Sequence, residues 1–231
     1  MKITCVLLLI ALMAASGTSV AASSGSCLEA VQDDLSKKWP DNKTINIVAF
    51  GHSVPAGYFA TPEVHSREAY PRLIADGLAA SYPTAVVNVI TSAVAGENSG
   101  RGLQRFKGEA LGHLPRVVTI DYGLNDRVLT IEQSRKNLAE MIRESKKADV
   151  CVVLVTPTID LSGDFPAAKS TLLGQVEMIQ ALGRAEGVPV ADAFDAFKSY
   201  RGNSKDLMAQ SNHPNAKGHQ LVADRILSLL R

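Results

Sequence analysis

Four residues in the sequence are of types that could together perform acyl transfer. Ser53 carries a hydroxyl, which becomes a useful nucleophile when a neighbouring base removes its proton. His213 precedes the last predicted helix, and a neutral histidine is a base near physiological pH. Gly96 lets a backbone N–H approach a substrate closely, and the amide of Asn125 can donate to a developing oxyanion. Each residue taken alone also fits an ordinary turn or cap.

The elements that must position these residues alternate between short β-rich runs and helical patterns. Strands are predicted at 45–50, 85–91, 117–122, 150–155 and 188–190, and helices at 28–38, 67–81, 102–112, 131–147, 171–186 and 215–230. This alternation predicts an α/β fold with a parallel sheet and helices on both faces. Ligands bind at the carboxyl ends of the strands in such sheets. Because Ser53, Gly96 and Asn125 each follow a strand, we expect them at that edge.

The turn around Ser53 differs from two familiar motifs. An α/β-hydrolase elbow reads Gly-x-Ser-x-Gly, but Pro55 stands where the second glycine would be. A nucleotide- or flavin-binding domain would carry Gly-x-Gly-x-x-Gly after the first strand, and that pattern is missing there. Taken alone, the segment therefore fits an ordinary Gly/Ser/Pro turn as well as a serine site.

The four residues occur in the order of the blocks of one known family. Residues 51–53 (Gly-His-Ser) resemble the first block of the SGNH-hydrolase superfamily, also called GDSL-type esterases and lipases, and Gly96 resembles its second-block glycine. Residues 123–126 (Gly-Leu-Asn-Asp) match the third block completely, and His213 with the following Pro-Asn is similar to the last block. The resemblance extends from about residue 45 to the end of the chain.

The resemblance implies a flavodoxin-like, three-layer α/β/α sandwich with a five-stranded parallel sheet, and an ester hydrolase. Carried over residue by residue, it implies that Ser53 is the nucleophile and His213 its general base. The backbone N–H groups of Ser53 and Gly96, with the side-chain amide of Asn125, would form the oxyanion hole. Such chemistry requires no metal and no organic cofactor.

Two positions depart from the family pattern. His52 stands in place of the first-block Asp, and Gln210 stands in place of the Asp three residues before the base. An amide cannot stabilise an imidazolium with charge as a carboxylate does. The side-chain carbonyl of Gln210, Asp206 or a backbone carbonyl could orient His213 instead, so we expect a Ser–His dyad with an unusual third member. The same departures motivate the alternative hypothesis of a catalytically weak or inactive binding protein with the same fold.

The N-terminal segment has the layout of a secretory signal peptide. Lys2 is followed by an uncharged apolar run at 3–15 and by small residues at 19–21. The run is too short to span a membrane comfortably, since a span takes about 20 apolar residues. We expect residues 1–21 to be removed on export to the periplasm or the exterior. Residues 22–43 would then be a lead-in segment, and 44–231 the SGNH-like domain.

The amino-acid composition limits the classes of molecule that the protein is expected to bind. The chain has 24 basic and 23 acidic residues, 46% hydrophobic residues and 20% charged residues. This balance argues against disorder and against a general nucleic-acid binder. It favours an uncharged small-molecule or carbohydrate ester as substrate. We also expect no membrane span after removal of the leader, and we expect a monomer. Loops at 59–66 and 156–165 are expected to set specificity.

Two cysteines remain after the predicted leader, Cys27 and Cys151. Cys151 lies in the apolar run 150–155, where a free buried cysteine behaves as a small hydrophobe. We therefore expect free thiols, although an exported chain could bridge the pair. Their separation does not resemble a zinc site. Lipid attachment at Cys27 is disfavoured because the expected Leu three residues earlier is absent.

Overall fold

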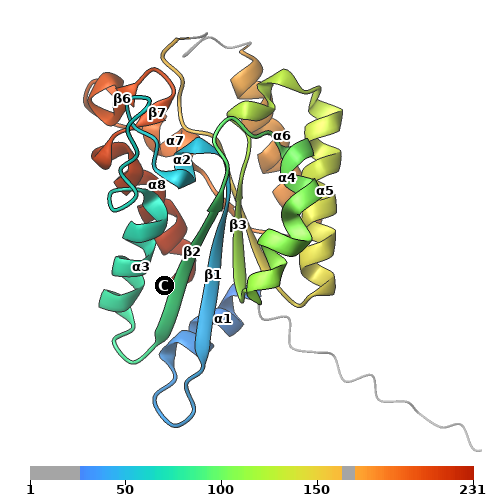
Figure 1. Cartoon of the computed structure of the whole chain (residues 1–231), viewed down its shortest axis with the longest axis vertical. Coiled ribbons are helices and arrows are strands. Elements are labelled where there is room, and N and C mark those ends of the chain that lie inside the picture. The colour runs from blue at the N-terminus through green and yellow to red at the C-terminus, as the bar shows by residue number, and fades with distance from the viewer. Residues whose placement is uncertain (1–26, 163–169) are drawn as a thin grey trace, which may run out of the picture.

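The computed structural model describes residues 27–162 and 170–231. A five-stranded parallel sheet with the order β2-β1-β3-β4-β5 forms the middle layer (Figure 1). This confirms the predicted α/β sandwich. The strands are β1 (Thr44–Gly51), β2 (Val86–Ala93), β3 (Val117–Asp121), β4 (Cys151–Val155) and β5 (Val190–Ala191).

Helices cover both faces of the sheet. In Figure 1, α3 and α8 lie on one side and α4 and α5 on the other, with α6 behind them. Two apolar cores result, one on each face, because alternate residues of the central strands point in opposite directions. The α-helices are α1 (Cys27–Ser36), α2 (Ser53–Ala56), α3 (Tyr70–Ser81), α4 (Ser99–Glu109), α5 (Ile131–Lys147), α6 (Thr171–Glu186), α7 (Ala193–Lys198) and α8 (Ala216–Leu230).

Short elements complete the edges of the fold. The strands β6 (Met208–Gln210) and β7 (His213–Pro214) form a separate antiparallel pair. Three 3-10 turns lie at η1 (Leu111–His113), η2 (Asn125–Val128) and η3 (Ser204–Leu207). Elements this short leave no periodic signal in a sequence, and none of these was predicted.

The boundaries of the longer elements follow local capping chemistry. Helices α5 and α6 match their predicted ranges. Helix α4 begins earlier than predicted because the side chain of Asn98 accepts a hydrogen bond from Arg101 N–H, at 3.2 Å, and caps the first turn. Helix α3 begins later, at Tyr70, with Pro71 in its first turn.

The position of β1 between β2 and β3 brings the site loops together. Gly51, its last residue, is in register with Ala93 of β2 and with Asp121 of β3. A Cβ atom at position 51 would collide with the backbone carbonyl of Asp121, so glycine permits this close approach. The segments that follow β1, β2 and β3 therefore emerge side by side at the carboxyl edge of the sheet.

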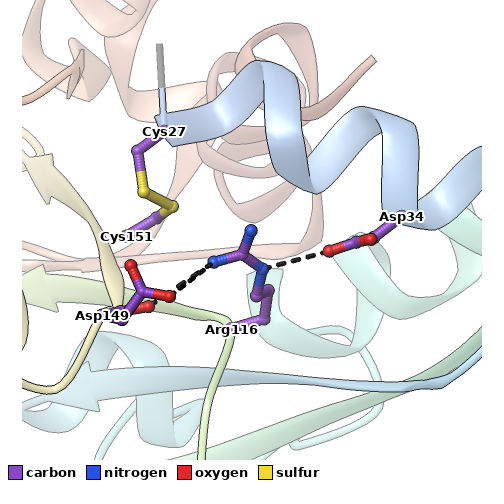
Figure 2. The surroundings of a disulfide bond; sticks show 5 residues. All are labelled: Cys27, Asp34, Arg116, Asp149 and Cys151. Atoms are coloured by element: carbon purple, nitrogen blue, oxygen red, sulfur yellow. Dashed lines mark hydrogen bonds and ion pairs between the residues drawn. A yellow bond between two sulfur atoms is a disulfide. The ribbon is translucent and has the colours of Figure 1, made fainter. Parts of the chain in front are cut away.

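The prediction of free thiols was wrong, because Cys27 and Cys151 form a disulfide (Figure 2). Cys151 begins β4, and Cys27 begins helix α1, which packs against α8. Figure 2 also shows Arg116 between the two chain segments, donating from Nε to the carboxylate of Asp34 at 3.2 Å and from Nη1 to the carbonyl of Asp149 at 3.5 Å. The two cysteines are 124 residues apart in the sequence, and no local pattern predicts that they meet.

The predicted signal peptide at 1–21 lies outside the described residues, as does the end of the second predicted specificity loop, at 163–165. Within 27–162 and 170–231, every helix is too short or too polar to cross a bilayer.

Candidate active site

Ser53 begins the one-turn helix α2, directly after β1. The ring of His52 caps this turn, because its Nδ1 atom accepts a hydrogen bond from Val54 N–H at 3.2 Å. Gly57 caps the C-terminus of α2, and its φ of 88° lies in the left-handed region that favours glycine. The Ser53 side chain is consequently fixed between two tight turns and is largely buried.

His213 lies opposite Ser53. Its Nε2 atom is 2.9 Å from Ser53 Oγ. The strand pair β6–β7 fixes the backbone of His213, and Asn215 caps the following helix α8 by accepting from the N–H groups of Lys217 and Gly218. The two residues that the sequence offers as nucleophile and base are thus within hydrogen-bonding distance.

The other ring nitrogen of His213 has two neighbours. The carbonyl oxygen of Phe59 lies 2.9 Å from Nδ1, and the side-chain nitrogen of Gln210 lies 2.8 Å from the same atom. Asp206, the other predicted candidate, lies in η3, where its carbonyl accepts from the side chain of Asn215. Nδ1 therefore lies within hydrogen-bonding distance of one acceptor, a backbone carbonyl, and of one donor, a side-chain amide nitrogen.

The surroundings of His213 lower its pKa below the ordinary value of 6.5. Burial is the largest cause, and the charge of nearby His52 acts in the same direction. The hydrogen bond to Phe59 and the charge of Asp160 act in the opposite direction but do not offset burial. His213 consequently remains neutral, and able to accept a proton, at pH values where an exposed histidine is partly charged.

The segments carrying Gly96 and Asn125 adjoin the Ser53 turn. Val94 N–H donates to the carbonyl of Gly51 at 3.0 Å, and Gly96 adopts a left-handed φ of 72°. One hydrogen of the Asn125 amide donates to the carbonyl of Glu97 at 2.9 Å. Because an amide nitrogen carries two hydrogens, the second remains for another acceptor.

The chain matches the family model of GDSL-like lipases and acylhydrolases over residues 49–221. The chain belongs to this family. A lipase/acylhydrolase from Enterococcus faecalis is 31% identical, with a TM-score of 0.69 over 80% of this chain and 94% of that one. Together these findings identify the chain as an ester hydrolase.

Other solved structures share the fold of this GDSL-like acylhydrolase at lower identity. Axe2, an acetylxylan esterase from Geobacillus stearothermophilus, is 17% identical, with a TM-score of 0.69 over 80% of this chain and 94% of that one. TesA is 19% identical, with a TM-score of 0.65 over 80% of this chain and 98% of that one. No curated protein sequence matches the chain significantly.

A charged network that no sequence motif marks supports the Gly96 segment of this acylhydrolase. Glu97 is buried, and its carboxylate accepts from Arg105 Nη2 and from Tyr122 OH, each at 2.6 Å. Arg105 also donates to the carbonyls of Gly51 and Ser92, and its guanidinium lies over a phenylalanine ring. The network ties the segments after β1, β2 and β3 to one another. Glu97 and Arg105 are eight positions apart and in different elements, so only the fold reveals their pairing.

His52, which departs from the family pattern, and Asp126, which belongs to the matching third block, each make buried contacts. His52 is completely buried, and its Nε2 atom lies 3.4 Å from the carboxylate of Asp121, while its Nδ1 caps the Ser53 turn. Asp126 is buried and accepts from Ser99 N–H at 2.7 Å, which caps the first turn of α4. Burial raises the pKa of Asp126, although the hydrogen bonds from Ser99 act to lower it.

In the part of the chain that the structure describes, His, Cys, Asp and Glu side chains do not gather into a group of three that could hold a metal ion.

Proposed function

We propose that this acylhydrolase is an exported serine esterase that cleaves acyl or acetyl esters by a covalent mechanism. Ser53 Oγ attacks the carbonyl carbon of the ester, and its proton passes to Nε2 of His213. The resulting imidazolium then donates that proton to the leaving alcohol. Water, activated by the same nitrogen, releases the acyl group and restores Ser53.

The developing oxyanion would be stabilised by three donors: the backbone N–H groups of Ser53 and Gly96 and the free hydrogen of the Asn125 amide. The existing hydrogen bond from Asn125 to the Glu97 carbonyl supports this role, because it fixes the direction of the amide before substrate arrives. One such donor contributes about 3 kcal/mol to lowering the barrier.

The distance of 2.9 Å between Ser53 Oγ and His213 Nε2 carries the proposal. The lowered pKa of His213 supports it as well, since a general base must be unprotonated at the working pH. The chemistry needs no metal ion and no organic cofactor.

The proposed substrates are uncharged acyl or acetyl esters of carbohydrates, lipids or small molecules. The near-neutral net charge of +1 provides little steering for charged substrates. One structural neighbour, Axe2, is an acetylxylan esterase, which motivates acetylated oligosaccharides as test substrates.

The test measures turnover of p-nitrophenyl acetate, butyrate and octanoate, and acetate release from acetylated xylo-oligosaccharides. We expect hydrolysis of at least one series, at rates far above those of Ser53→Ala. Equal rates for wild type and Ser53→Ala on every ester would reject the esterase mechanism and favour the alternative of a binding protein with this fold. Gln210 is the observation that favours that alternative, because it offers His213 a donor in place of a carboxylate.

Export is proposed from the leader-like segment at 1–21, and the disulfide between Cys27 and Cys151 supports it. Disulfides persist mainly in oxidising compartments such as the periplasm and the exterior. Fractionation with N-terminal sequencing of the mature protein tests the proposal. We expect a non-cytosolic protein beginning at Ala22, whereas a cytosolic protein retaining Met1 would contradict it.

A further inference from the structure

The Nδ1 atom of His213 lies between a hydrogen-bond acceptor and a hydrogen-bond donor. The acceptor is the Phe59 carbonyl, and the donor is the side-chain amide of Gln210. A neutral imidazole has one proton, so Nδ1 either donates to Phe59 or accepts from Gln210. These two tautomers leave the Nε2 atom, which faces Ser53, in opposite states.

Only one of the two tautomers is a base toward Ser53. When Nδ1 holds the proton, Nε2 has a free lone pair and can accept the serine proton. When Nδ1 accepts from Gln210, Nε2 is protonated and cannot. In serine hydrolases, loss of the correct tautomer lowers kcat by roughly 10⁴-fold.

The direction of the Gln210 amide is fixed by groups other than His213. Its Oε1 atom accepts from the backbone N–H of Thr61 at 2.9 Å, and its Nε2 atom donates to Asn212 Oδ1 at 2.8 Å. Turning the amide over would bring its NH₂ group against the Thr61 N–H, which can only donate. Gln210 therefore presents a donor to His213 and cannot accept the Nδ1 proton.

Two sets of contacts fix the position of the Phe59 carbonyl, one made by the backbone of Phe59 and one by its ring. Phe59 N–H donates to the carbonyl of Glu63 at 3.0 Å. The buried Phe59 ring stacks against His65, with ring centroids 4.2 Å apart, and against His219, at 5.4 Å. An acceptor fixed in this way needs little reorganisation when His213 becomes charged.

We infer that the Phe59 carbonyl is the group that holds the Nδ1 proton of His213, and that Gln210 is a positioning residue that opposes this hydrogen bond. The inference rests on the proposed roles of Ser53 and His213. As Ser53 Oγ bonds to the ester carbon, the carbonyl electron pair moves to oxygen and the serine proton moves to Nε2. The imidazolium keeps its Nδ1–H on Phe59. A carboxylate at position 210 would accept that proton as well and complete a charged triad.

Other ionisable groups act on His213 through charge over longer distances. They face it from the Ser53 turn (His52), from the segment after β4 (Asp160) and from α8 (His219). Asp160 is itself paired with Arg127 at 2.8 Å. At hydrogen-bonding distance, the tautomer depends on the two groups at Nδ1 and on Ser53 at Nε2, whose hydroxyl can donate or accept.

The first test is the tautomer itself, measured by ¹⁵N NMR on histidine-labelled protein at pH 8, with the His213 signals assigned by loss in His213→Ala. We expect a protonated Nδ1 and an unprotonated Nε2. The reverse pattern would overturn the inference. This measurement needs no enzymatic activity, so it remains decisive even if the esterase proposal fails.

The second test is Gln210→Glu, which keeps an oxygen for Thr61 N–H and replaces the opposing donor with an acceptor. We expect kcat to rise by at least about tenfold, because a carboxylate stabilises the imidazolium. The acid limb of the pH profile should also move to higher pH, since a nearby negative charge raises the histidine pKa. Asn212→Asp is the matched control, because it adds the same charge beside Gln210 rather than at His213. Unchanged or lower kcat in Gln210→Glu, or an equal gain in Asn212→Asp, would contradict the inference.

The third test weakens the Phe59 carbonyl directly. Replacing Ala60 by lactic acid converts the peptide bond after Phe59 into an ester, whose carbonyl is a poorer acceptor. Ala60 is exposed, and within the described residues its N–H makes no hydrogen bond that would be lost. We expect kcat to fall about tenfold in wild type, as for a lost hydrogen bond to a charged group, and to fall much less when Gln210→Glu supplies a second acceptor. Equal losses in both backgrounds, or none in wild type, would overturn the inference.

Discussion

Ser53 Oγ and His213 Nε2 are 2.9 Å apart, although 160 positions separate the two residues in the chain. The contact depends on two unrelated local structures: the tight turn after β1 and the small β6–β7 pair before α8. A short hairpin, closed by an antiparallel bridge between Tyr58 and Val64, links them. Tyr58 N–H donates to the Ser53 carbonyl, and the carbonyl of Phe59 contacts His213. Substitutions in that hairpin should therefore affect catalysis without touching either reacting side chain.

Activity should persist to lower pH than the ordinary histidine pKa would allow. Burial lowers the pKa of His213 below 6.5, and the reaction requires its neutral form. We expect the acid limb of kcat/KM for p-nitrophenyl acetate to lie below pH 6.5, with activity lost as the pH falls through the pKa of His213. Asp160→Asn removes a charge that raises this pKa, so the limb should move further toward acid. A wild-type limb at or above pH 6.5 would contradict the account.

Asn125→Ala should impair the chemical step more than substrate binding. Loss of one oxyanion donor typically lowers kcat by about 100- to 1,000-fold. We expect steady-state kinetics to show that decrease in kcat, with a much smaller change in KM. Thermal unfolding of the variant controls for damage from the lost hydrogen bond to the Glu97 carbonyl. A folded variant with nearly wild-type kcat would remove Asn125 from the oxyanion hole.

The disulfide should contribute substantially to stability. It links positions 124 residues apart and fastens α1 to the start of β4. Crosslinks of this kind stabilise proteins by about 2–5 kcal/mol, partly by restricting the unfolded chain. We expect the Cys27→Ser, Cys151→Ser double variant to lose that much free energy of unfolding in urea titrations. Its kcat should be unchanged, because the bridge lies at the opposite end of the sheet from Ser53.

His219 should make the protein less stable in acid. Burial, with the charge of His213 acting in the same direction, lowers the pKa of His219 to about 3. Below pH 6.5, His219 binds a proton in the unfolded chain but stays neutral in the native protein. The native state therefore keeps its full stability above pH 6.5 and loses free energy of unfolding as the pH falls toward 3. The loss is about 1.4 kcal/mol per pH unit.

The variant His219→Asn tests that dependence, because its side-chain oxygen can still accept the hydrogen bond from Tyr70 N–H. Urea unfolding between pH 6 and pH 4 should show a shallower decline for the variant than for wild type. Parallel declines would mean that His219 is not the group responsible.

The sequence predicts where the candidate site lies, because three of its proposed residues come shortly after strands. Ser53, Gly96 and Asn125 each come after an apolar β run, and parallel strands bring such positions to one edge. His213 was predicted from its place before the last helix together with the family resemblance. These signals are local in the chain and need no knowledge of packing.

What the sequence could not predict depends on backbone atoms and on distant pairs. The Phe59 carbonyl belongs to the backbone, so no residue type marks it. The pairing of Glu97 with Arg105, and the bridge between Cys27 and Cys151, depend on how separate elements pack. The apolar run around Cys151 predicts a free buried thiol, and only the position of α1 brings Cys27 to it as a partner.

The most direct test of the account is whether Ser53 becomes covalently modified during turnover. Wild type, Ser53→Ala and His213→Ala would be treated with a fluorophosphonate and examined by intact and peptide mass spectrometry, alongside p-nitrophenyl acetate hydrolysis. We predict one phosphonate per wild-type chain, located on Ser53, no labelling of Ser53→Ala, and background turnover by both variants. Labelling at another residue, or hydrolysis by Ser53→Ala at the wild-type rate, would contradict the account.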